Sequence, residues 1–193
     1  MSSLRDDGLQ AIQPYITQLI TNDQVQRFTR SCFQHAPDYF WEIPASSSGR
    51  YHPAWALGES GLFRHTIAVM YLCKELGSTF GLTETDKDLA VCAGAIHDTF
   101  KYGRNYQVED IALHPFFPRP YYKDRNLDPC PYALLPPNTY DVVMKAVEAH
   151  MGDIAHGTWT TVAKVKPETP LEQVVHLADY ISSRKRIHFL DFL

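Results

Sequence analysis

Polar residues interrupt segments that are otherwise apolar and have helical spacing, and they constrain this chain more than any other feature. Residues 89–96 read LAVCAGAI, an apolar run that His97 and Asp98 follow directly. His65 stands in a segment rich in Leu, Ile and Val, and Asp179 follows Val-Val-His-Leu-Ala. Because burying an unpaired carboxylate costs several kcal/mol, both aspartates must have a positive partner in the folded protein.

The length and composition predict one soluble domain. The chain has 193 residues, of which 45% are hydrophobic and 21% charged, close to the average of globular domains. The net charge of -4 excludes a global positive field for polyanions. We expect a cytoplasmic protein without a membrane partner, because no apolar stretch of about 18 residues and no secretory signal are found. The oligomeric state is left open.

Apolar spacing predicts an all-α bundle built as one domain over residues 1–193. An N-terminal pair of helices within residues 1–35 is interpreted as a lid or outer layer. Four further helices are expected: from Glu59 or Ser60 to a C-cap at Gly77, from Thr83 or Thr85 to His97 and Asp98, over 139–151, and from the N-cap Thr169 through Ile181.

Two long irregular loops are expected between these helices. The periodicity disappears over residues 36–61, and seven of the 13 prolines lie between Pro115 and Pro137. We expect residues 158–165 to be extended. The four cysteines are far apart and form no CxxC pair, so they are interpreted as reduced thiols, with Cys73 and Cys92 in the core.

A divalent metal ion would satisfy His65, His97, Asp98 and Asp179 together. Imidazole with carboxylate is a donor set suited to Mn, Fe, Co, Ni or Zn, and less to Mg or Ca alone. The alternative for a histidine is an ordinary structural hydrogen bond. The alternative for an aspartate is helix capping or an ion pair, and Lys101 and Arg184 are near enough in sequence to provide one.

The order of these four residues resembles the HD superfamily of metal-dependent phosphohydrolases. The resemblance spans roughly residues 44–185 and implies an HD-domain helical bundle in which His65, His97, Asp98 and Asp179 bind a metal ion. The chain is most similar to the HD module of the YhaM-type 3'→5' exoribonucleases. The matching segments are PA at 44–45, His52, GLFRHT at 61–66, AGAIHDTFK at 93–101, HMG at 150–152, PETP at 167–170 and HLAD at 176–179.

Two departures limit this closer resemblance. Those exonucleases carry an OB-type nucleic-acid-binding domain before the HD module, whereas residues 1–35 predict two helices. The segment 115–137 also differs from its counterpart. A grip on long single strands therefore has little support, and a small nucleotide is at least as good a substrate as RNA.

Several HD branches bind a second ion with further histidines, and His114 and His150 resemble those ligands. Asp98 would then bridge the two ions. The alternatives are that His114 begins a loop and that His150 hydrogen-bonds at a helix end, or acts as a base if one ion is bound. His156 is a further candidate ligand.

Five residues are candidates for binding the phosphate or covering the metal: Lys101, Arg64, Arg50, Arg184 and His52. The resemblance implies a phosphate contact for Lys101, and guanidinium groups bind phosphate oxygens in a bidentate manner. Aromatic residues could stack on a base, although each is more often part of a core. They are Trp55, Phe116, Phe117, Tyr121, Tyr122 and Trp159.

These features predict hydrolysis of a phosphoester of a nucleotide or of single-stranded nucleic acid by metal-activated water. Asp98, Lys101 and His150 are the expected catalytic residues. A nucleotidase differs from an exonuclease in substrate alone. The rival in another class is a non-catalytic HD-fold module that senses a nucleotide or a metal, and the simplest alternative is a helical scaffold with structural histidines.

Overall fold

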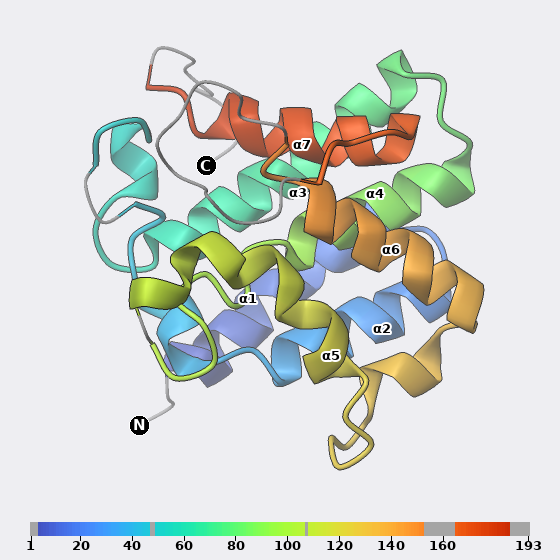
Figure 1. Cartoon of the computed structure of the whole chain (residues 1–193), viewed down its shortest axis with the longest axis horizontal. Coiled ribbons are helices and arrows are strands. Elements are labelled where there is room, and N and C mark those ends of the chain that lie inside the picture. Colours follow the sequence, from blue (N-terminus) through green and yellow to red (C-terminus); the bar gives the residue numbers. More distant parts are fainter. Residues whose placement is uncertain (1–3, 47–48, 107, 153–164, 186–193) are drawn as a thin grey trace.

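The computed structural model describes residues 4–46, 49–106, 108–152 and 165–185, without the side chains of 108–110 and 112. The described residues form helices and no strand, so the all-α prediction is confirmed (Figure 1). The α-helices are α1 (Leu4–Leu19), α2 (Asp23–Gln34), α3 (Gly61–Thr79), α4 (Glu84–Ile96), α5 (Pro118–Tyr122), α6 (Pro137–Ala149) and α7 (Pro170–Ser182). Short 3-10 helices are η1 (Asp38–Trp41), η2 (Ala54–Ala56), η3 (Val108–Phe116) and η4 (Pro131–Leu134).

Helix α4 is the centre of the bundle. Its residues from Asp88 to Ile96 are all buried, and it contacts α2, α3, α6 and α7. Gly94 allows α3 to approach closely, because a Cβ there would lie 2.7 Å from the Cys73 sulfur. As a result α3, α4 and α7 pack together (Figure 1), which brings the ends that carry the polar residues to one place.

Helices α1 and α2 form an outer layer, as expected. Ile12, Ile16 and Phe28 are fully buried, with α1 packed on α3 and α2 packed on α4. Asp88 fastens the turn between α1 and α2 to α4. Its carboxylate accepts hydrogen bonds from the Thr21 hydroxyl at 2.7 Å and from the Asn22 amide at 2.8 Å.

The predicted C-cap of α3 is wrong by three residues, because it is Phe80 and not Gly77. The helix continues through Gly77 to Thr79, and Gly81 takes the left-handed conformation (φ 68°) that a glycine at a helix end adopts. Gly77 is needed instead for close packing, because a Cβ there would lie 2.8 Å from the Lys87 Cγ.

The segment 115–137 is more helical than the proline count indicated. Prolines occupy the first turns of α5, η4 and α6, where a backbone N–H would have no hydrogen-bond acceptor within the helix. Helix α6 accordingly begins at Pro137. The described part of segment 36–61 is a loop with η1 and η2, closed by a hydrogen bond from the Ala45 amide to the Ala56 carbonyl at 3.0 Å. Most of 158–165 lies outside the described residues.

All four cysteines are free thiols, as expected, and Cys73 and Cys92 lie in the core. Among the helices of the described part of the chain, none combines the length and apolar character needed to cross a membrane.

Candidate metal centre

Four residues from three helical ends converge at the centre of the bundle. His65 lies in the first turns of α3, His97 and Asp98 directly follow α4, and Asp179 lies in α7. The His65 Nε2 lies 3.1 Å from the Asp179 Oδ1, and the His97 Nε2 lies 3.8 Å from the same oxygen. The Asp98 Oδ2 lies 3.5 Å from the His97 Nε2 and 3.9 Å from the His65 Nε2.

Two further histidines face the other oxygen of Asp98. The Asp98 Oδ1 lies 2.9 Å from the Nε2 of His114, in η3, and 3.7 Å from the Nε2 of His150, at the C-terminal end of α6. The two Nε2 atoms are 3.0 Å apart. The single Asp98 carboxylate therefore presents one oxygen to each of two sets of imidazoles, which is the arrangement of a bridging ligand.

Backbone carbonyls fix the tautomers of three of these imidazoles. The Nδ1 atoms of His97, His114 and His150 lie 2.7, 2.5 and 2.7 Å from the carbonyl oxygens of Gly94, Ile111 and Val147. A carbonyl oxygen only accepts hydrogen bonds, so each Nδ1 carries the proton. In the neutral ring Nε2 then has a free lone pair that points into the cluster, as in metal-binding histidines.

Ser182 fixes the fourth imidazole through its hydroxyl. The Ser182 hydroxyl donates its hydrogen to the Asp179 carbonyl oxygen at 2.9 Å. Its oxygen is therefore left to accept from the His65 Nδ1, which lies 3.2 Å away. Ser182 thus leaves the His65 Nε2 without a hydrogen, in the same orientation as the other three.

The cluster fits a divalent cation. The Nε2 atoms of His65 and His97 are buried and have no hydrogen-bond partner among the described residues, an arrangement that is costly in a protein interior. The His114 and His150 Nε2 lone pairs face each other at 3.0 Å, which is repulsive unless a positive group lies beside both. Ligand atoms of three overlapping groups each lie within 4.8 Å of one another: His65, His97 and Asp98; His97, His150 and Asp179; Asp98, His114 and His150.

Burial opposes ionisation of both aspartates, but the neighbouring groups overcome it. The charge of Lys101 and the close contacts with His97 and His114 hold the pKa of Asp98 well below its usual range. The contact with His65 at 3.1 Å and the neighbouring His97 likewise lower the pKa of Asp179. Both carboxylates are therefore anionic at neutral pH, the form in which a carboxylate binds a metal.

The imidazoles differ in the direction of their pKa shifts. Burial, together with His114 and His97, lowers the pKa of His150 to about 3. Burial also lowers the pKa of His65. At His97 burial acts in the same direction, but the charges of Asp98 and Asp179 outweigh it and raise the pKa.

Lys101 lies in the turn after α4 and contacts the Asp98 Oδ2. Burial disfavours its charged form, but Asp98 and Asp179 raise the pKa of Lys101, so the ammonium group is cationic. Helix α4 ends before Lys101, so the turn, and not a continued helix face, places this side chain at the cluster.

The other candidates for phosphate contacts differ in what they touch. Arg64 donates to the Trp55 and Leu57 carbonyl oxygens at 2.6 and 3.0 Å, and so fixes the loop before α3. The His52 ring lies 5.3 Å from the His65 ring. The guanidinium carbon of Arg184 lies 3.8 Å from the centre of the Tyr180 ring.

Tyr51 joins two of these candidates. Its ring centre lies 5.4 Å from the guanidinium carbon of Arg50 and 5.8 Å from that of Arg184. The Lys185 amide donates to the Tyr51 carbonyl at 2.8 Å, which holds the loop against the end of α7. His52 thus lies beside His65, and Arg50 and Arg184 flank Tyr51 at the end of α7.

The positioning roles of Ser182 and His176 were not predicted from the sequence. Ser182 follows Asp179 by three positions on α7, and this spacing is the sequence feature from which its role could have been predicted. His176 precedes Asp179 by three, and its Nδ1 donates to the His150 carbonyl oxygen at 2.7 Å. Of the aromatic candidates, Tyr122 is fully buried in the core. His156 and Trp159 lie outside the described residues.

Comparison with protein families finds one match. A family model described as HD domain matches residues 62–184, a range that contains all six residues of the cluster. Comparisons with curated proteins and with solved structures find no significant match. HD domains are typical of metal-dependent hydrolases, and the buried cluster has the residue types that such a site needs. The chain therefore belongs to the HD domain family.

Proposed function

We propose that this protein is a phosphohydrolase that cleaves a phosphoester of a small nucleotide with two divalent metal ions. The observation that carries the proposal is the Asp98 carboxylate, whose Oδ2 faces His65 and His97 while its Oδ1 faces His114 and His150. A purely structural carboxylate has no need of four bare imidazole nitrogens around it.

Two ligand sets follow from these contacts. His65, His97, Asp98 and Asp179 would hold one ion, and Asp98, His114 and His150 would hold the other. Ions at such positions supply an activated water and stabilise the charge that develops on phosphoryl oxygens. If only the first set is filled, the free Nε2 of His150 is placed to accept the proton of the attacking water.

Lys101 and the neighbouring arginines bind the anionic substrate. The cationic Lys101 ammonium lies at the edge of the cluster and can turn from Asp98 to a phosphoryl oxygen. Asp179 has a side chain that is 24% exposed, whereas His65 and His97 are fully buried, so the substrate enters from the Asp179 side. Arg184 follows α7, the helix that carries Asp179, and His52 lies beside His65.

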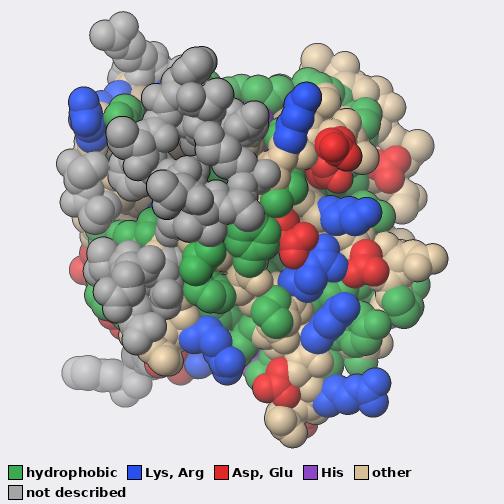
Figure 2. All heavy atoms as spheres, viewed as in Figure 1, with side chains coloured by type: hydrophobic (Ala, Val, Ile, Leu, Met, Phe, Trp, Pro, Cys, Tyr) green, Lys and Arg blue, Asp and Glu red, His purple; other side chains and the backbone are tan. Residues whose placement is uncertain are grey.

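A small nucleotide is favoured over a long strand. On the face seen in Figure 2, the described Lys and Arg side chains alternate with Asp and Glu side chains and form no basic field along which a strand could lie. A groove that follows a nucleic-acid backbone requires such a field. The alternative with the same chemistry is exonucleolytic cleavage, as in the YhaM-type enzymes that the sequence resembles.

A phosphoesterase panel tests this proposal. Purified protein is incubated with Mn, Fe, Co, Ni, Zn or Mg and with 2'-, 3'- and 5'-nucleotides, cyclic nucleotides, and short single-stranded RNA and DNA. We expect phosphate release from a mononucleotide and its loss in Asp98→Asn, which keeps the side-chain shape. If only the oligonucleotides are cleaved, the substrate is a nucleic-acid strand and not a small nucleotide. No turnover with any ion would contradict the proposal.

One contact favours a second candidate, a non-catalytic HD-fold module that senses a nucleotide or a metal. The Lys101 ammonium contacts the Asp98 oxygen that faces His65 and His97, so this carboxylate has a positive partner without an ion. A module of this kind should bind its ligand without turnover across the panel, and its nucleotide binding should be unchanged in Asp98→Asn.

A further inference from the structure

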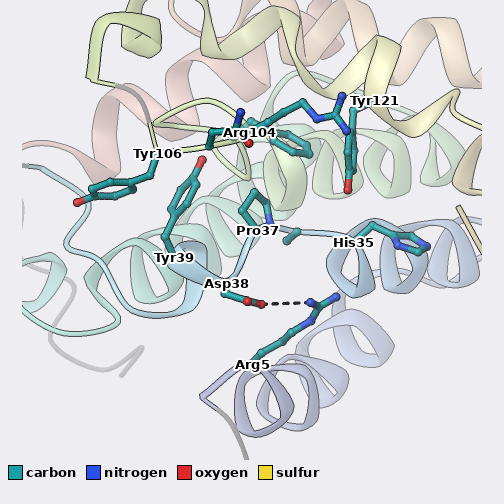
Figure 3. Close-up of a pocket in the computed structure, with 11 residues that line it drawn as sticks. Arg5, His35, Pro37, Asp38, Tyr39, Arg104, Tyr106 and Tyr121 are labelled. Carbon is teal, nitrogen blue, oxygen red and sulfur yellow. Dashed lines mark hydrogen bonds and ion pairs between the residues drawn. The ribbon is translucent and has the colours of Figure 1, made fainter.

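A second cavity lies outside the metal centre. It has a volume of about 590 Å³, within the range of roughly 300–1,000 Å³ of small-molecule sites (Figure 3). Its walls come from the start of α1, the junction of α2 and η1, the turn after α4, and α5. No residue of the metal cluster lines it.

Aromatic rings form one side of this cavity. The Tyr39 and Tyr106 rings lie 5.2 Å apart between their centres, at an angle of 60°. The Tyr39 hydroxyl donates to the Gly103 carbonyl at 2.6 Å and accepts from the Tyr102 amide at 3.2 Å. Tyr39 therefore holds the turn that carries Tyr106 in one conformation.

Tyr106 is placed at the rim at a cost in stability. It has a φ of 59°, in the left-handed region that tyrosine rarely adopts, and it is 52% exposed. Its ring contacts the Tyr39 and Tyr102 rings, at centre distances of 5.2 and 5.1 Å, and about half of the residue remains open to a ligand. Such residues are concentrated at ligand sites, where the ring gains its contacts from the ligand.

The charges of the cavity leave one cation for a ligand. The Arg5 guanidinium contacts the Gln34 carbonyl and lies 3.1 Å from the Asp38 carboxylate, so its charge is neutralised (Figure 3). The guanidinium carbon of Arg104 lies 4.5 Å from the Tyr121 ring centre. Among the side chains that the structure describes, Arg104 has no carboxylate partner within ion-pair distance.

We propose that this cavity binds a nucleoside monophosphate, with the base against Tyr106 and the phosphate on Arg104. The planar base can stack on the exposed Tyr106 ring. The Arg104 guanidinium, which has no carboxylate partner among the described side chains, can bind the single phosphate group. A nucleic-acid strand would need a row of cations, which the Arg5 and Asp38 pair does not provide. This site is additional to the metal centre and does not depend on the reaction proposed there.

Calorimetric titration with AMP, GMP, CMP and UMP tests the site. The full-length protein is titrated in EDTA, so that binding through metal ions does not contribute. At least one mononucleotide is expected to bind with a dissociation constant below a millimolar, and the corresponding nucleoside and inorganic phosphate are each expected to bind at least tenfold more weakly. Absence of binding by all four mononucleotides would overturn the proposal.

Two variants identify the cavity as the place of binding. Tyr106→Gly removes the ring and the backbone strain together, so we expect at least tenfold weaker binding and an unchanged or higher melting temperature. Arg104→Ala is expected to weaken mononucleotide binding to the level of the nucleoside. Arg125→Ala, an exposed arginine outside the cavity, is the matched control and should bind like the wild type.

Two further outcomes would also overturn the proposal. Binding that is lost in Asp98→Asn but retained in Tyr106→Gly and Arg104→Ala places the nucleotide at the metal centre. A ten-nucleotide single-stranded RNA that binds more than a hundredfold tighter than the mononucleotide identifies the cavity as part of a path for a strand. Failure of turnover at the metal centre leaves the titration result unaffected, so the two proposals fail separately.

Discussion

Asp88 and Asp98 are both buried carboxylates on or next to α4, and they differ in what stabilises their charge. Asp88 accepts hydrogen bonds from the Thr21 amide and hydroxyl and from the Asn22 amide, and Lys74 lies 3.6 Å away. Asp98 faces imidazoles and Lys101. The sequence predicted a special role for Asp98 because an apolar run precedes it. It gave no such signal for Asp88, which follows a polar, helix-capping segment.

Replacing Asp88 tests its role as a structural residue. Asp88→Ala leaves three donors without an acceptor, so we expect the free energy of unfolding in urea to fall by about 2–4 kcal/mol. The metal content should not change. Glu75→Ala, at an exposed position on α3, is the control and should stay within about 0.5 kcal/mol of the wild type. An equal effect of both substitutions would contradict this role.

At the cluster, His114→Ala separates the two ligand sets. His114 contacts Asp98 through Oδ1 only, so its loss should remove one ion per chain and leave the ion held by His65, His97, Asp98 and Asp179. Metal analysis after dialysis measures the ratio. A variant that loses all its metal, or none, would show that the cluster does not contain two separable sites.

At the scale of the elements, local signals predicted the starts of helices better than their ends. Thr169 is the N-cap that the sequence predicted, and it forms a capping box with Glu172, one turn away. The end of α3 depends on whether Gly77 or Gly81 faces a neighbouring helix, which is a tertiary property. The sequence placed His65, His97, Asp98 and Asp179 on helices, but the orienting contacts of Ser182 and His176 require the packing of α7 against α3 and α6.

The end of α6 depends on a close contact between two elements. Gly152 has a φ of 67°, and a Cβ there would lie 2.4 Å from the His176 ring, which also binds the His150 carbonyl. We expect Gly152→Ala to cost about 1 kcal/mol for the backbone conformation and about 1–3 kcal/mol more for the clash. Because His150 shifts with this turn, metal affinity should fall about 10–100-fold.

Gly81→Ala is the matched control for this prediction. Gly81 has a φ of 68° and no atom within 4 Å of an added Cβ. Its replacement should cost only the backbone term of about 1 kcal/mol and leave metal affinity unchanged. Urea unfolding and metal titration of both variants compare the two effects. Equal metal affinities would show that the contact with His176 does not position His150.

At the scale of the whole molecule, the cluster makes the stability of the metal-free protein depend on pH. The pKa values of His52 and His150 fall from 6.5 to about 3 on folding, mainly through burial, and burial lowers that of His65 as well. Only His97 shifts upward among the histidines with a resolved change. Between pH 6.5 and 4 the unfolded chain therefore binds more protons than the folded one, so acid favours unfolding.

Urea unfolding in EDTA across this range measures the dependence. The free energy of unfolding should decrease as the pH falls from 6.5 to 4, with each neutral buried histidine contributing up to about 1.4 kcal/mol per pH unit. His52→Gln removes one titrating group without adding charge and should reduce the slope. A flat profile, or greater stability in acid, would show that the imidazoles are not held neutral.

The central claim is that six side chains from α3, the end of α4, η3, α6 and α7 bind divalent ions. Its most direct test is the metal-to-protein ratio of tag-free protein, measured by elemental mass spectrometry after reconstitution with Mn, Fe, Co, Ni or Zn and dialysis. The account predicts two ions per chain with at least one of these metals, and near-complete loss in Asp98→Asn. A ratio near zero with every metal, or an unchanged ratio in Asp98→Asn, would contradict it.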